Sequence, residues 1–203
     1  MTQISVFKGD LPDNISFKDM VAVDTETMGL NLKRDRLCLV QLSDGLGNAY
    51  LVQIIKGIDC PNLKRVLTDK NILKIFHFAR FDVAKILNDL EVEVNPVYCT
   101  KIASKLSRTS SPSHSLKSLC FDLLNVVLEK EQQTSDWGCE ELSKAQQSYA
   151  ANDVLYLHQL KEKLDALLQR EGRYALAMEC FSFLGTRAKL DLLSFDDPDI
   201  FTH

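Results

Sequence analysis

The feature that most constrains the fold is a short apolar run that ends in two acids, Val21-Ala22-Val23-Asp24-Thr25-Glu26-Thr27. A strand alternates its side chains between two faces, so Asp24 and Glu26 share one face and Thr25 and Thr27 share the other. Neighbouring carboxylates repel each other, which destabilises a fold unless a positive charge lies between them. A divalent cation with oxygen ligands meets this need. Two solvated acids at a strand end are the alternative, and the rest of the chain decides between them.

Further apolar segments predict a mixed sheet around this strand. The segments 37–42 and 49–54 follow this strand, and the glycine-containing turn 44–48 separates the two. Three consecutive strands with short links favour an antiparallel meander. Strand-like segments then alternate with helical ones, and the sequence Ser143-Lys144-Ala145-Gln146 predicts a capping box at the start of the longest helix. Strands are expected at 20–26, 37–42, 49–54, 72–76 and 97–99, and helices at 62–67, 81–90, 102–106, 116–128, 143–170 and 174–184. This order predicts an α/β fold, a five-stranded mixed sheet flanked by helices with strand 20–26 at its centre.

Composition excludes several classes of protein. The length of 203 residues indicates a single domain over 1–203, and no apolar run is long enough to cross a bilayer. The N-terminus lacks the pattern of a signal peptide, so we expect a cytoplasmic protein with no membrane partner. The six cysteines form no C-x-x-C pair, which favours reduced thiols over structural zinc. The net charge of −4 argues against tight binding of long duplex DNA and leaves a short nucleic-acid substrate open.

Two further carboxylates complete a candidate site. Asp82 follows a buried strand at the start of a helix, where an acid can also simply complement the helix dipole. Asp153 lies four residues after Tyr149, so both point to the same side of a helix. The alternative interpretation of Asp153 is a partly exposed acid on a helix surface. With Asp24 and Glu26, these acids can surround two divalent cations about 4 Å apart, an arrangement that clamps the attacking and leaving oxygens of a phosphoryl displacement. All-oxygen ligands favour Mg²⁺ or Mn²⁺, and a nearby phenol can orient the attacking water.

The motifs Asp24-x-Glu26, Asp82 and Tyr149-x-x-x-Asp153 resemble the three exonuclease motifs of the DEDD superfamily, in its tyrosine-containing branch. The segments 116–120, 135–137 and 149–157 resemble RNase D. The segments 77–82, 99–106 and 187–193 resemble nano-RNase C, nearly from end to end of the chain.

This resemblance implies an RNase H-like fold and a 3′–5′ exoribonuclease that cuts very short oligonucleotides, dinucleotides above all, as a homo-octamer. It also implies that the four acids are metal ligands and that Tyr149 positions the water. The apolar residues of 174–203 are expected to pack against a neighbouring subunit.

Candidate substrate contacts fall into two groups. Leu30 matches the apolar wedge that separates the last two bases in related exonucleases, and His77 and Phe81 flank the second motif. The alternative for Leu30 is an ordinary loop leucine, and the alternative for His77 and Phe81 is packing in the core. The segment 94–121 contains no Asp or Glu, and we expect its cations to meet the far phosphate of a short RNA, although a solvated loop would look the same. The candidates in this segment are Arg108, His114 and Lys117.

Three other functions stay open at this point. An RNase D-like enzyme would trim longer or structured RNA, and a proofreading-type exonuclease would act on DNA. An inactive RNA-binding protein on the same fold is the third, although unused clustered acids would only reduce its stability.

Overall fold

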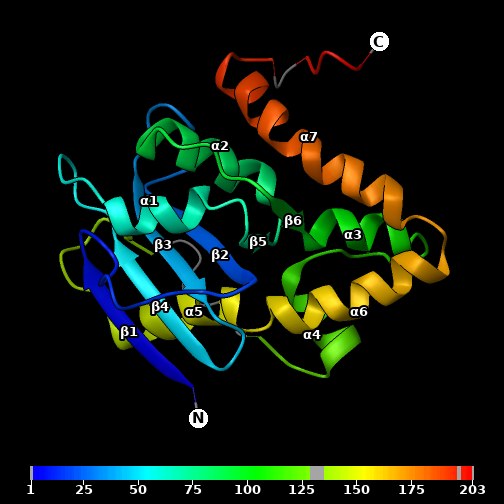
Figure 1. Ribbon diagram of the computed structural model, residues 1–203, viewed down its shortest axis with the longest axis horizontal. Helices are drawn as coiled ribbons and strands as arrows, with labels where there is room; N and C mark the ends of the chain where they lie inside the picture. Colours follow the sequence, from blue (N-terminus) through cyan, green and yellow to red (C-terminus); the bar gives the residue numbers. More distant parts are fainter. Residues whose placement is uncertain (1, 129–134, 196–197, 203) are drawn as a thin grey trace.

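The computed structural model describes residues 2–128, 135–195 and 198–202. Its centre is a mixed sheet of six strands in the order β1-β4-β3-β2-β5-β6 (Figure 1). The strands are β1 (Gln3–Lys8), β2 (Met20–Thr27), β3 (Leu37–Ser43), β4 (Asn48–Gln53), β5 (Leu73–Phe76) and β6 (Val97–Cys99). The helices are α1 (Pro61–Thr68), α2 (Ala79–Leu90), α3 (Thr100–Ser107), α4 (Leu116–Leu124), α5 (Lys144–Leu155), α6 (Leu157–Arg170) and α7 (Tyr174–Leu192).

The predicted architecture is confirmed, with one strand more than expected. β2, β3 and β4 form the antiparallel meander, and β5 and β6 extend the sheet in parallel on the other side of β2. The strand that carries Asp24 and Glu26 is therefore central. The prediction of five strands was wrong because the N-terminal lead-in also joins the sheet, as β1 pairing in parallel with β4.

Helices cover both faces of the central strands. Every residue of β3 is buried, which requires apolar partners above and below the sheet. α5 packs against β2, β3 and β4, while α2 contacts β3, β5 and β6 (Figure 1). The elements that carry the sequence-predicted acids thus meet around the central strand.

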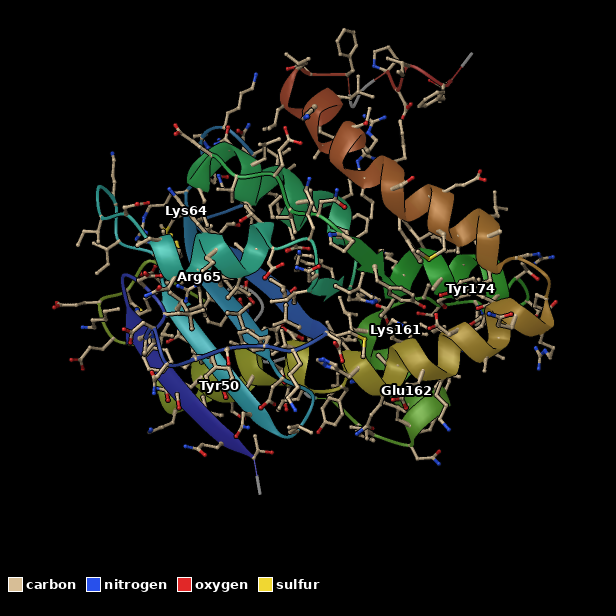
Figure 2. All side chains as sticks on the ribbon, viewed as in Figure 1. Tyr50, Lys64, Arg65, Lys161, Glu162 and Tyr174 are labelled. Carbon is tan, nitrogen blue, oxygen red and sulfur yellow. The ribbon has the colours of Figure 1, made fainter. Side chains whose placement is uncertain are left out.

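The remaining helices form a second layer beside the sheet. α6 packs on α3 and α4, and α7 runs along α2 (Figure 1). The Tyr98 hydroxyl of β6 donates to Asp165 of α6. Asp165 also accepts from Lys161 on the same helix, which is labelled in Figure 2. This partly buried polar contact joins the second layer to the sheet. No helix in the described ranges combines the length and apolar character needed to cross a membrane.

The largest differences from the predicted helix boundaries are found in three helices. The helix expected at 143–170 is interrupted at Tyr156, which caps both α5 and α6, because α5 follows the sheet while α6 packs on other helices. Its predicted capping box is present: Ser143 Oγ accepts from Gln146 N and Gln146 Oε1 accepts from Ser143 N. α4 ends early, at Leu124, where Asn125 takes a left-handed cap, and α7 runs on to Leu192.

A buried lysine stabilises the start of β5, next to the edge strand β6. Lys74 has no exposed surface, and its Nζ donates to the carbonyl oxygens of Asp69, Ile72 and Asn95, each at 2.7 Å. We expect Lys74→Ala to lower the free energy of unfolding by about 3 kcal/mol, because it leaves a cavity and three carbonyls without their donor. Urea unfolding measures this. Lys70→Ala, at an exposed position, is the control, and an equal loss in both variants would contradict the prediction.

Candidate active site

Three carboxylates meet between the central strand and α5. Asp24 and Glu26 of β2 and Asp153 of α5 each offer an oxygen atom, and these atoms all lie within 4.8 Å of one another. Strand alternation places the first two on one face, and the packing of α5 against β2 brings in the third. The sequence predicted this convergence, and the structure brings the three acids together.

The fourth acid, Asp82, approaches from the first turn of α2. It is only 5% exposed and lies outside the group of three, although its charge raises the pKa values of Asp24 and Asp153. The Thr25 hydroxyl donates to Asp82 Oδ1 at 2.6 Å. Thr25 therefore orients the fourth acid from the opposite face of β2, a role that sequence reasoning missed because it depends on where α2 docks.

The electrostatics of the quartet are unfavourable without a cation. Burial raises the pKa of all four carboxyls, and their mutual repulsion raises those of Asp24, Glu26 and Asp153 further. The pKa of Glu26 rises to about 9 and that of Asp82 to about 7. A set of converging oxygen ligands that repel one another suits a hard divalent cation, whose charge stabilises the ionised form of each acid.

Tyr149 lies one helical turn before Asp153 and hydrogen-bonds to its carboxylate. Burial and the charge of Asp153 raise the pKa of the phenol, so the hydroxyl keeps its proton at neutral pH. Trp137, 3% exposed, packs beside it with ring centroids 6.0 Å apart. The phenol is thus held beside the acids by the helix on one side and an aromatic ring on the other.

Gln41 is a second supporting residue that sequence reasoning missed. It pairs with Asp24 in the β2–β3 register and is fully buried, and its Nε2 donates to Asp24 Oδ2 at 3.2 Å. The signal was present, because Gln41 is the one polar residue in the apolar run Leu37–Leu42. A buried amide in such a run needs a polar partner.

Leu30 is presented at the tip of an ordered loop. The side chain is 86% exposed, while the backbone around it is tied down: the Asn31 N–H donates to Asp35 Oδ2 at 3.0 Å. The buried Lys85 donates from its Nζ to the Leu32 carbonyl at 2.8 Å. These hydrogen bonds hold the loop while the Leu30 side chain stays exposed, and its role as a wedge stays a prediction.

His77 and Phe81 lie on either side of the start of α2. His77 Nδ1 is hydrogen-bonded to Thr100 Oγ1 at 2.9 Å, and burial together with the charge of Lys101 lowers the pKa of its imidazole to about 3. The ring is therefore neutral. Phe81 is half-buried and lines a cavity of 340 Å³ together with Leu30, so the structure brings these two predicted contacts together.

The basic segment folds into α3, a connecting loop and α4. Ser104 Oγ is hydrogen-bonded to His114 Nδ1 at 2.8 Å, and Lys117 is exposed. The guanidinium of Arg108 pairs with Asp122 of α4, and its contact with the phosphate stays a prediction. Burial and the charges of nearby cations, Arg108 first, lower the pKa of His114.

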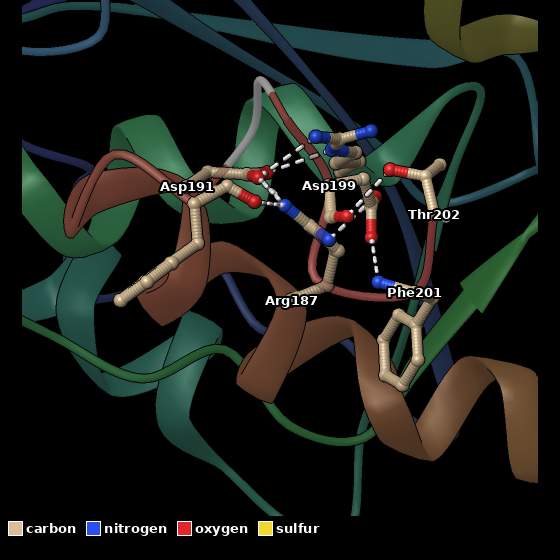
Figure 3. Close-up of polar contacts among 7 residues, drawn as sticks. Arg187, Asp191, Asp199, Phe201 and Thr202 are labelled. Atoms are coloured by element: carbon tan, nitrogen blue, oxygen red, sulfur yellow. Dashed lines mark hydrogen bonds and ion pairs between the residues drawn. The ribbon is translucent and has the colours of Figure 1, made fainter.

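Two arginines connect the C-terminal region to the active-site helix. Asp191 of α7 accepts two hydrogen bonds from Arg80 of α2, at 2.7 and 2.8 Å, and is also bound by Arg187. Arg187 reaches the tail through Asp199 Oδ2 at 2.8 Å and the Phe195 carbonyl at 2.6 Å (Figure 3). The tail, α7 and the first turn of α2 therefore form one polar network.

Comparison with known proteins agrees with this geometry. The sequence profile of a family described as 3′–5′ exonuclease matches residues 10–169, which include all four acids and Tyr149. The chain belongs to the 3′–5′ exonuclease family. As an exonuclease of this family, it is 31% identical to Ribonuclease D of Acidiphilium cryptum over 163 residues, which cover 80% of this chain and 41% of that protein. It is 36% identical to DNA polymerase I of Aquifex aeolicus over 146 residues, which cover 72% of this chain and 24% of the polymerase.

Among solved structures, the similarity extends over nearly the whole of this chain. Brucella melitensis NrnC superposes with a TM-score of 0.95 at 51% identity, covering 99% of this exonuclease and 98% of NrnC. NrnC has also been solved bound to pGG and with bound Mg²⁺, each at 50% identity to this chain. The chain thus spans less than half of its RNase D and polymerase relatives but matches NrnC over nearly its full length. The exonuclease belongs to the RNase D-like group and resembles nano-RNase C, as the sequence motifs indicated.

Proposed function

We propose that this exonuclease is a 3′–5′ exoribonuclease that hydrolyses short oligoribonucleotides, dinucleotides above all, to nucleoside 5′-monophosphates. The observation that carries the proposal is the convergence of Asp24, Glu26 and Asp153, with Asp82 beside them. The full-length likeness to NrnC, which has been solved with pGG, supports the short substrate.

The quartet would hold two divalent cations, Mg²⁺ or Mn²⁺. When bound, such ions polarise the scissile phosphate and stabilise the charge that develops on it. NrnC has been solved with bound Mg²⁺, which supports this choice of metal. Within the protein, Gln41 and Thr25 orient Asp24 and Asp82 through hydrogen bonds. Tyr149, as a neutral phenol beside Asp153, would orient the attacking water.

The preference for short RNA follows from where the binding groups lie. A long RNA gains affinity from cations along an extended track. Here the chain is acidic overall, and its acid-free stretch is confined to residues 94–121. Leu30, Phe81 and His77 would hold the bases, and Lys117 and His114 the far phosphate, with Arg108 positioned by Asp122. Such a site gains little from a third or later nucleotide.

A length series tests the function. 5′-labelled RNAs of two to about twenty nucleotides, followed as product time courses, should give the highest kcat/KM for dinucleotides. A higher kcat/KM for the longest RNA would overturn the dinucleotide preference and favour RNase D-like trimming, the function that the 31% identity to Ribonuclease D supports. DNA dinucleotides of the same sequence test selectivity for RNA. Undiminished turnover in excess EDTA would refute the metal-dependent mechanism.

Assembly into a homo-oligomer, an octamer by resemblance, is part of the same proposal. Apolar side chains of α7 and the tail lie exposed on this chain and would pack against a neighbouring subunit. These residues are Leu176, Met178, Phe183, Leu193, Phe195, Ile200 and Phe201. Light scattering at micromolar concentration should report an oligomer, and a monomer would contradict this part of the proposal.

A further inference from the structure

Phe78 has a backbone conformation that its own packing does not explain. It caps α2 with φ 68° and ψ 41°, in the left-handed region, and its ring is 48% exposed. A non-glycine residue there costs roughly 1–2 kcal/mol, and an exposed ring recovers little of this by burial. Backbone strain that packing does not offset is concentrated at functional sites, so we examine whether the Phe78 ring binds a ligand.

The surroundings of the ring identify the chemistry of that ligand. Phe78 lines the same 340 Å³ cavity as Leu30 and Phe81, so three apolar side chains face one space. Its volume is that of a small-ligand pocket. Asn31, Lys33 and Arg80 add polar groups to the lining, and Arg80 is held by Asp191. An apolar slot with polar edges suits a flat heterocycle that carries hydrogen-bonding groups.

A lysine beside the Phe78 ring could bind a negatively charged group of the same ligand. Lys101 Nζ lies 4.0 Å from the centroid of the Phe78 ring, as a cation–π contact. Lys101 belongs to α3, the first helix of the basic segment. Its charge lowers the pKa of His77, the residue before Phe78, and that of His114 in the basic segment. Lys101 therefore joins the Phe78 ring to the segment whose cations would receive the far phosphate.

We propose that Phe78 is the stacking platform for the nucleobase of the 5′ nucleotide of a short RNA, and that Lys101 neutralises the phosphate of that nucleotide. The inference rests on the proposed function, and it adds a binding residue outside the predicted set of Leu30, His77 and Phe81. The base stacks on the Phe78 ring, in the cavity that Phe78 lines together with Leu30 and Phe81. A neighbouring copy of the chain is the competing occupant of this surface, and the experiment separates the two.

Three substitutions at one position isolate stacking from strain. Phe78→Asn removes the ring but suits the left-handed backbone, so the protein should melt no lower than the wild type. Phe78→Leu keeps an apolar side chain without an aromatic face, and Phe78→Trp keeps the face. We expect KM for an RNA dinucleotide to rise about tenfold in the Asn and Leu variants, since base stacking contributes about 1–3 kcal/mol, with kcat within about twofold of wild type and with Trp near wild type.

Substrate choice locates the base. Purines stack more strongly than pyrimidines, so the wild type should favour a 5′ purine and Phe78→Asn should lose that preference while keeping any preference at the 3′ position. Unchanged KM in Phe78→Asn, or Phe78→Leu equal to wild type, would overturn the inference. Loss of the oligomer in Phe78→Asn by light scattering would also overturn it, since the ring would then be a subunit contact.

Binding measured without turnover separates this inference from the proposed function. In a Tyr149→Phe background, calorimetric titration with the RNA dinucleotide should show about tenfold weaker binding when Phe78→Asn is added. If the wild type hydrolyses no short RNA but this difference persists, the proposed function fails and the stacking role stands. If the wild type is active and the difference is absent, the stacking role alone fails.

Discussion

Asp24→Asn should abolish hydrolysis and at the same time stabilise the metal-free protein. Asp24 lies at the centre of the repulsion, since Asp82, Asp153 and Glu26 all raise its pKa in addition to burial. Removing its charge removes a metal ligand, which we expect to lower kcat/KM at least about 10³-fold, because metal-ion catalysis supplies several kcal/mol of transition-state stabilisation. The same change removes the repulsion, so the melting temperature in EDTA should rise.

The raised pKa values also predict how the stability of the metal-free protein changes with pH. The folded-state pKa values of the quartet lie above their unfolded values, so folding favours the protonated acids. The metal-free protein should therefore lose stability as pH rises from about 4 to about 9, the range between the unfolded pKa values and that of Glu26. Asp24→Asn should make stability depend less steeply on pH, and saturating Mg²⁺ should oppose the loss of stability at high pH.

The control is Glu162→Gln, which replaces an exposed acid on α6 and should leave activity and melting temperature unchanged (Figure 2). A lower melting temperature for Asp24→Asn in EDTA would contradict the view that the acids destabilise the metal-free fold.

Tyr149→Phe should retain substrate binding and lose most of the turnover. The substitution removes only the hydroxyl that bonds to Asp153, while the ring that packs beside Trp137 remains. General acid–base or water-orienting groups contribute about 10²–10⁴-fold, so kcat should fall by that factor with KM within about threefold. Steady-state kinetics on a dinucleotide measures both constants.

Tyr156→Phe is the matched control, because it removes a phenol hydroxyl seven residues further along the same chain segment, at the junction of α5 and α6. Its kcat should stay within about twofold of wild type, as expected for a hydroxyl away from the acids. A Tyr149→Phe rate as high as that of this control would remove Tyr149 from the mechanism.

The sequence predicted those parts of the molecule that depend on a local period. Strand alternation placed Asp24 and Glu26 on one face, and the four-residue helical spacing placed Tyr149 beside Asp153, as the structure has them. The same logic located the meander and the capping box at Ser143.

What the sequence could not predict depends on contacts between distant segments. The hydrogen bond from Thr25 to Asp82 requires the docking of α2, and that from Gln41 to Asp24 requires the register of β2 with β3. The pairing of Arg108 with Asp122 joins the loop to α4. The left-handed backbone of Phe78 has no signal in a residue type that rarely adopts it.

The hydrophobic core of the described residues is built from apolar side chains, and the four acids are positioned by this core rather than contributing to it. Catalysis and folding are therefore separable in this chain, and a single neutralising substitution in the quartet would remove the first while sparing the second. The Leu30 loop and the basic segment would persist in such a variant. Under the proposed function, such a variant would bind short RNA without cutting it to mononucleotides. The loss of one carboxylate would then convert a degrading enzyme into a sequestering protein that withholds short RNA from other enzymes.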